Sequence, residues 1–255
     1  MDGLLLAAGC LVAGGLIGFT GGVLGIGGGL LAIPLLALVL GMEQQLAQGT
    51  AMVMVLPAVL MTLRQYNRYS KLDIEAALVG GTASMLFTWV GAQIALGMDP
   101  VLLRRIYASF IFCISVFYFH QSSRKRRPRS AAAHVPSPGR LWFVVVGGIA
   151  GFTGGVFGVG GSVMVVPLLT TVLRYSQTGA QGVALSMVVP STTVAMITYA
   201  MHGQVQWLAG VPLALGSIML VPYGVRLAYA LPEPRLKLIF ACMLLVIMMM
   251  LLFKA

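Results

Sequence analysis

Long apolar stretches separated by short polar segments run through almost the whole chain. In the first part they cover 4–20, 30–41, 46–63, 74–97 and 101–119, and in the second part 141–153, 163–173, 179–200, 207–231 and 236–253. About 20 apolar residues are enough for a helix to cross a hydrocarbon core of roughly 30 Å. The pattern therefore predicts an all-α fold, a polytopic bundle of transmembrane helices with two short helices among them.

The composition supports a membrane protein. Of the 255 residues, 59% are hydrophobic and only 9% are charged, whereas a soluble domain usually carries about 25% charged residues. Because so few charged side chains cannot cover a water-facing surface, a soluble domain with one anchor is excluded. The first apolar stretch is preceded by Asp2 and no basic residue, so we do not expect a cleaved signal peptide.

Basic residues gather in one segment between the two parts. Six of the sixteen Lys and Arg residues lie within 124–140. Such a run can bind nucleic acid, but between hydrophobic blocks it is more typical of a cytoplasmic loop. We therefore expect no nucleic-acid partner and three regions: a first transmembrane repeat (1–120), a basic cytoplasmic linker (121–139) and a second transmembrane repeat (140–255).

The two parts are copies of one another. The segment 18–36 matches 151–169 at 12 of 19 positions, with an offset of 133 residues. The same offset aligns Gln48 with Gln181, and Tyr66 with Tyr199. Since a bias toward Gly, Ala and Val would not place Gln and Tyr in one register, the sequence indicates an internal duplication.

The relative orientation of the two copies depends on how each glycine cluster is crossed. If the two runs around a cluster form two passes or one re-entrant hairpin, each repeat crosses the membrane an odd number of times and the two halves are inverted. If the two runs form one broken crossing, the halves are parallel. The inverted arrangement places Arg174, Arg235 and Lys237 inside, with the turn near 202–205 outside. We expect inversion because it follows the charge bias better.

The glycine clusters are the strongest candidates for a site. Glycine disfavours a continuous helix and permits positive φ, and irregular backbone within a membrane is tolerated only in protein or along a cavity. A helix that begins after such a break presents free N–H groups and a positive partial charge to an anion. The candidate substrate-binding glycines are Gly22, Gly25, Gly27, Gly28 and Gly29, and Gly155, Gly158, Gly160 and Gly161.

Dense glycine also suits close helix packing or a nucleotide cofactor. Small residues let helices pack closely without any ligand. A dinucleotide-binding fingerprint is a weak match, because a βαβ context and a downstream acidic residue are lacking. Two dense clusters, each followed by a proline (Pro34 and Pro167), favour the substrate site.

Neutral polar side chains accompany the clusters. They could bind an oxyanion that must also leave, or they could join helices by hydrogen bonds. The candidates are Gln48 and Thr50 in the first half, and Ser162, Gln181, Ser186 and Ser191 in the second. Gln48 and Gln181 are favoured because the duplication retains both. We expect Arg226 to extend toward a membrane interface.

Groups for other chemistry are sparse. The acidic residues all lie in expected loops or helix ends, so a buried carboxylate relay has no candidate. The histidines and the single cysteines (Cys10, Cys113, Cys242) form neither a metal cluster nor a nucleophilic triad. We therefore expect no catalytic residue, no metal, no cofactor and no enzymatic activity.

The duplicated glycine motif, its Pro-Leu-Leu ending and the Ala-Gln-Gly that follows resemble the TauE/SafE sulfite exporter family (TSUP, DUF81). The resemblance covers both halves, with the family motif on 21–34 and 154–167. It implies a multi-pass permease in a bacterial inner membrane, serving sulfur metabolism by carrying sulfite, thiosulfate or an organosulfonate.

The expected function is transport of such an anion by alternating access. The expected partners are the small sulfur-containing anion and the lipid bilayer, and association into a homo-oligomer stays open. A passive anion channel, and a membrane subunit that binds a ligand without moving it, are the alternatives. The direction of transport and the coupling ion are open as well.

Overall fold

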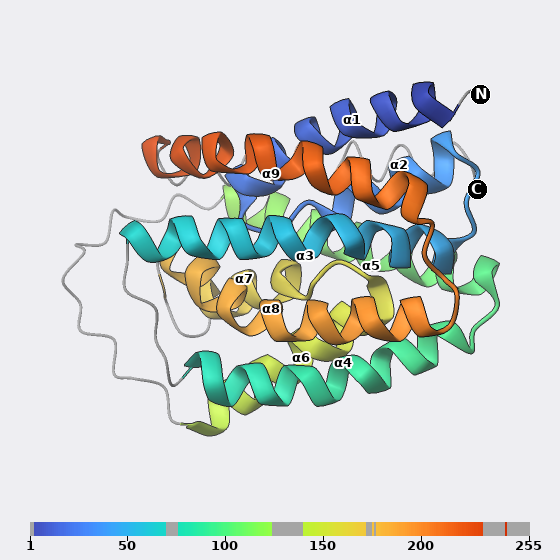
Figure 1. The fold of residues 1–255 in the computed structure, drawn as a ribbon. Coiled ribbons are helices and arrows are strands. Elements are labelled where there is room, and N and C mark those ends of the chain that lie inside the picture. Colours follow the sequence, from blue (N-terminus) through green and yellow to red (C-terminus); the bar gives the residue numbers. More distant parts are fainter. Residues whose placement is uncertain are drawn as a thin grey trace.

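A computed structural model shows a bundle of helices (Figure 1). It describes residues 3–69, 76–123, 140–171, 175, 177–231 and 243, and these contain no strand. The expected helix over 236–253 lies outside the described residues, except for Met243. The helices are α1 (Gly3–Leu24), α2 (Gly29–Val39), α3 (Gln44–Tyr69), the π-helical turn η1 (Ala76–Gly80), α4 (Gly81–Leu96), α5 (Pro100–Ser123), α6 (Arg140–Phe157), α7 (Ser162–Thr171), α8 (Gln177–Met201) and α9 (Trp207–Ala230).

Seven of the described helices are long and apolar enough to cross a membrane. The two short apolar helices, α2 and α7, each follow a glycine cluster. Large apolar side chains cover the outside of the bundle; Leu4, Leu86 and Met219, for example, are 85%, 71% and 66% exposed. Exposure of such a large apolar surface to water is unfavourable, so we expect this surface to face lipid.

The long helices form layers. In Figure 1, α1 and α9 lie along one edge of the bundle, α4 and α6 lie along the opposite edge, and α3 and α8 lie between these two pairs. The buried core therefore sits around α3 and α8, with the short helices α2 and α7 packed against them.

Glycines bring the outer helices close together. A Cβ on Gly18 would lie 2.5 Å from the Cα of Ser217 in α9, and a Cβ on Gly151 would overlap the carbonyl oxygen of Ser84 in α4. Such approaches leave no room for a side chain. The close crossings α1/α9 and α4/α6 are therefore built on small residues, as is common for helices packed in membranes.

A buried proline is compensated by a side chain from another helix. Pro34 lies inside α2 and has no N–H, so the carbonyl of Leu30, four residues earlier, lacks its usual helical partner. The hydroxyl of Tyr107 in α5 donates to this carbonyl at 3.3 Å. Tyr107 is fully buried, and its hydrogen bond joins α5 to α2.

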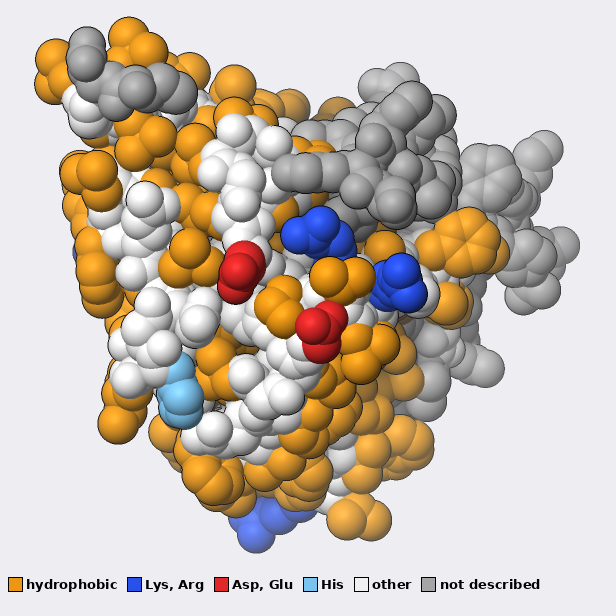
Figure 2. Space-filling view, turned by 90° about the vertical axis from the view of Figure 1, so that its right-hand side faces the viewer, with side chains coloured by type: hydrophobic (Ala, Val, Ile, Leu, Met, Phe, Trp, Pro, Cys, Tyr) orange, Lys and Arg blue, Asp and Glu red, His pale blue; other side chains and the backbone are white. Residues whose placement is uncertain are grey.

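Polar groups mark one end of the bundle. The loops that join α2 to α3, α4 to α5 and α8 to α9 all lie at the right-hand end of Figure 1, and Figure 2 views that end. The acidic residues of the described part, Glu43 and Asp99, belong to these loops, and Figure 2 shows acidic, basic and histidine side chains there. This end is suited to an aqueous interface.

Candidate functional site

The first glycine break separates α1 from α2. Helix α1 continues through Gly21 and Gly22 and ends at Leu24, because Gly25 adopts a left-handed conformation (φ +66°). Gly27 and Gly28 are left-handed as well, with φ of +72° and +82°. All residues from Gly25 to Gly28 are buried. The chain reverses here inside the protein, and α2 begins directly after Gly28.

The second break has the same backbone conformation. Gly158, Gly160 and Gly161 have φ of +69°, +73° and +69° and lie between α6 and α7. They occupy the positions of Gly25, Gly27 and Gly28 plus 133. Both clusters therefore form left-handed turns that only glycine adopts without strain.

The two breaks meet inside the bundle. A Cβ on Gly29, the first residue of α2, would lie 3.2 Å from the carbonyl oxygen of Gly158 and 3.4 Å from the Cα of Val159. Val55 of α3 lies beside Gly29 and beside Gly160. Segments 133 residues apart are thus packed against each other, and both are buried.

Each short helix begins with backbone donors that lack a partner. Within the described part of the chain, the N–H groups of Gly29 and Leu30 in α2 and of Val163 in α7 have no hydrogen-bond acceptor. The three residues are buried. The first N–H groups of any helix have no intrahelical acceptor and need another partner. Here they make an electropositive region suited to an anion.

A buried glutamine lies across each break. The side chain of Gln181 in α8 lies against Gly25, and the side chain of Gln48 in α3 lies against Gly158. Each glutamine therefore contacts the break of the other half. Both are fully buried, and each accepts a hydrogen bond from a buried tyrosine.

The amide of Gln181 is hydrogen-bonded at both ends. Its Oε1 accepts from the hydroxyl of Tyr66 at 2.5 Å, and its Nε2 donates to the carbonyl of Leu24 at 2.7 Å. Leu24 is the last residue of α1, and the last carbonyls of a helix have no intrahelical donor. Gln181 thus caps α1 and fixes the first break.

The amide of Gln48 is bonded at one end only. Its Oε1 accepts from the hydroxyl of Tyr199 at 2.8 Å, and that hydroxyl also lies 3.1 Å from the carbonyl oxygen of Gly155. The Nε2 of Gln48 is buried and has no partner. The hydroxyl of Ser162, at the start of α7, is likewise buried without a partner. Two unpartnered side-chain groups therefore lie at the second break.

The remaining predicted residues lie apart from this contact or are already bonded. Gly22 and Gly155 face the backbones of α9 and α4 at the helix crossings. Thr50 is buried, and its hydroxyl accepts the N–H of Gln206 at the start of α9. Ser186 and Ser191 donate to carbonyls of their own helix, Val183 and Val188.

The sequence pattern predicted no role for Tyr66 and Tyr199, although they lie 133 positions apart. Tyr66 on α3 and Tyr199 on α8 each bond the glutamine of the opposite half. The pairing of two retained tyrosines with two retained glutamines is the signal that could have found them.

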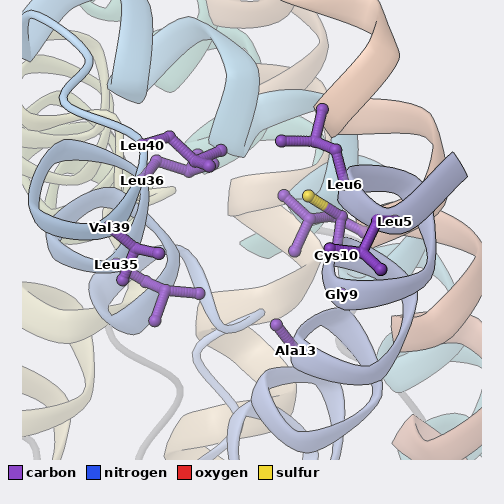
Figure 3. Close-up of a pocket in the computed structure, with 10 residues that line it drawn as sticks. Leu5, Leu6, Gly9, Cys10, Ala13, Leu35, Leu36, Val39 and Leu40 are labelled. Atoms are coloured by element: carbon purple, nitrogen blue, oxygen red, sulfur yellow. The ribbon is translucent and has the colours of Figure 1, made fainter. Parts of the chain in front are cut away.

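An apolar cavity of about 180 Å³ lies away from the breaks, between α1 and α2 (Figure 3). Leu5, Leu6, Cys10, Leu36 and Leu40 are among its lining residues. It offers an anion neither a donor nor a charge, so it is not part of the candidate site.

Buried glycine breaks between apolar spans, with unpartnered donors in the protein interior, suit a membrane transport protein. A sequence model of the sulfite exporter TauE/SafE family matches residues 10–251, so the chain belongs to that family.

Curated relatives agree with this class. A probable membrane transporter protein of Xylella fastidiosa strain Temecula1 is 25% identical over 209 residues, which are 81% of this chain and 78% of that protein. One from Methanocaldococcus jannaschii is 21% identical over 181 residues, or 69% of this chain and 65% of the relative. No solved structure matches the chain.

Proposed function

We propose that this protein is a permease that carries a small sulfur-containing anion across a bacterial inner membrane by alternating access. One observation carries the proposal: two buried glycine breaks touch, and each is followed by a short helix with at least one unpartnered N–H in its first turn, Gly29 and Leu30 in α2 and Val163 in α7. Membership of the sulfite exporter family supports a sulfur-containing anion as the substrate. Sulfite, thiosulfate and organosulfonates all present oxygens that accept N–H hydrogen bonds.

The substrate is held between the breaks. Neutral amides and hydroxyls stabilise the anion without a buried cation, so the anion can also leave. The contact between Gly29 and Gly158 leaves no space for an anion. The breaks must therefore separate to admit it, and their separation toward one side and then the other would give alternating access.

The two halves are arranged as inverted repeats in this proposal. Two features support it. In Figure 1, α3 runs away from the end with the polar loops, whereas its equivalent, α8, runs toward that end. The contacts also exchange between halves: Tyr66 bonds Gln181, and Tyr199 bonds Gln48. An exchange of this kind is typical of two units related by a two-fold axis.

The test is flux of radiolabelled sulfite and thiosulfate into proteoliposomes, with empty liposomes as the control. We expect saturable uptake, competition by one class of sulfur anion, and counterflow when unlabelled anion is preloaded. Uptake that rises linearly with concentration and shows no counterflow would instead indicate a passive anion channel.

Two further results would overturn the proposal. Binding of a sulfur anion by calorimetry, without flux, would indicate a ligand-binding membrane subunit. No binding and no flux for any sulfur anion, in protein shown to be folded by its thermal transition, would remove the substrate class. Because the second result leaves the membrane fold untouched, carboxylates and other oxyanions would then be screened in the same assay.

A further inference from the structure

The two breaks share one backbone conformation but differ in the side chains around them. At the second break, the Nε2 of Gln48 and the hydroxyl of Ser162 are buried and unpartnered. At the first break, the position equivalent to Ser162 is Gly29, which has no side chain, and the amide of Gln181 is already bonded at both ends. The unpartnered side-chain donors therefore lie on one side of the contact between the breaks.

The central helices α3 and α8 also differ in the side chains that they place beside the breaks. Thr192 of α8 has its hydroxyl beside Gly160 of the second break, whereas the equivalent residue of α3, Val59, places a methyl group beside Gly27 of the first. Thr192 and Val59 are both fully buried. The hydroxyl of Thr192 donates to the carbonyl of Val188, so its oxygen adds polarity rather than a free proton.

We infer that the substrate binds in one orientation, with its charged oxygens at the second break and a less polar end against the first. This inference rests on the permease proposed above and narrows its substrate class. An anion with one charged head and one apolar end, such as an alkylsulfonate, fits this arrangement better than an anion that is polar all round. Gln48 and Ser162 bind the head group, and Gln181 acts as a positioning residue for α1.

Binding of the charged head group at the second break is tested with Gln48→Leu and Ser162→Gly. The second variant gives α7 the residue that α2 has at the equivalent position. Ethanesulfonate binding is measured by calorimetry in detergent, with Ser109→Ala, an exposed hydroxyl on α5, as the matched control. A hydrogen bond to a charged group is worth enough to predict a roughly 10- to 100-fold rise in Kd for each variant. We expect the control to bind as the wild type does.

Gln181→Leu tests whether Gln181 positions α1 rather than binding the substrate. It removes the cap on Leu24 and the acceptor of Tyr66, so we expect a larger fall in the thermal midpoint than in Ser162→Gly or in Gln48→Leu, where the Tyr199 hydroxyl keeps the carbonyl oxygen of Gly155 as an acceptor. Equal midpoints in all three variants, or unchanged binding in Gln48→Leu and Ser162→Gly, would overturn the assignment.

Contact of the less polar end of the substrate with the first break is tested with Val59→Thr. This variant keeps the side-chain shape and copies Thr192. We expect weaker binding of propanesulfonate, by a few-fold, and unchanged binding of sulfite, which has no carbon end. Equal effects on both anions, or no effect on either, would overturn the orientation. Wild-type protein that binds no sulfur anion would instead refute the proposed function, so the two failures are distinguishable.

Discussion

Left-handed glycines occur in this protein in two environments. Gly161 lies in the second break, where a Cβ would overlap the carbonyl oxygen of Ala150. Gly203 lies in the turn before α9 with φ +70°, where a Cβ would meet nothing within 4 Å. A side chain introduced at either position would have to adopt the left-handed conformation, but only a side chain at Gly161 would also clash with the backbone.

This difference gives a matched pair of variants. We expect Gly203→Ala to lower the free energy of unfolding by about 1–2 kcal/mol, the cost of the left-handed conformation. Gly161→Ala should cost more, because the backbone of α6 must move as well, and less folded protein should reach the membrane. The thermal midpoint and the yield of folded protein in detergent measure both. Equal losses would mean that the break has room for a side chain.

For the same reason, a leucine at Gly28 or Gly161 is a poor probe of substrate binding. A Cβ at Gly28 would already lie 2.8 Å from the side chain of Ile17. A loss of transport in such variants would report a distorted break, whereas Gln48 and Ser162 lie in helices α3 and α7, where a substitution requires no left-handed side chain.

At the scale of elements, the apolar runs predicted most helices but not their ends at the breaks. The first apolar run covers 4–20, yet α1 extends to Leu24. Gly21 and Gly22 stay helical because they are packed against Gly28 and against Val221 of α9. Such contacts outweigh the low helix propensity of glycine, and they cannot be read from the local pattern.

The crossing of α1 and α9 provides the next prediction. A Cβ on Gly18 would touch the backbone of Ser217, whereas a Cβ on Gly9 of the same helix would have nothing within 4 Å. We expect Gly18→Ala to force the helices apart and to cost about 1–3 kcal/mol, the usual range for overpacking. Gly9→Ala should be neutral or stabilising by up to about 1 kcal/mol, because alanine favours helix.

Thermal unfolding of both alanine variants in the same detergent checks this prediction. Gly9→Ala also controls for the general effect of removing a glycine from α1. A loss of stability in Gly9→Ala that matches the loss in Gly18→Ala would show that the crossing tolerates a methyl group, and the close approach would then not hold α1 in place.

At the scale of the whole molecule, the sequence predicted a membrane bundle and named the residues at the breaks, because both are recorded in local composition. It could not predict that Gln48 contacts the second break or that Gln181 contacts the first. That exchange depends on how α3 and α8 pass each other at the centre of the bundle. The unequal bonding of the two amides depends on the same tertiary packing.

The arrangement of the halves can be tested with residues that are 133 positions apart. Gly97 follows α4 and Ala230 ends α9, and both are exposed. In a background without Cys10, Cys113 and Cys242, each is replaced by cysteine and labelled in intact cells with a membrane-impermeant maleimide. We expect Gly97→Cys to react from outside and Ala230→Cys to react only after permeabilisation, because inverted copies place equivalent positions on opposite sides. His202→Cys, in the turn between α8 and α9, should react together with Gly97→Cys. Parallel copies would place Gly97 and Ala230 on the same side, so both cysteines would react in intact cells or both only after permeabilisation, and that result would overturn the inverted arrangement.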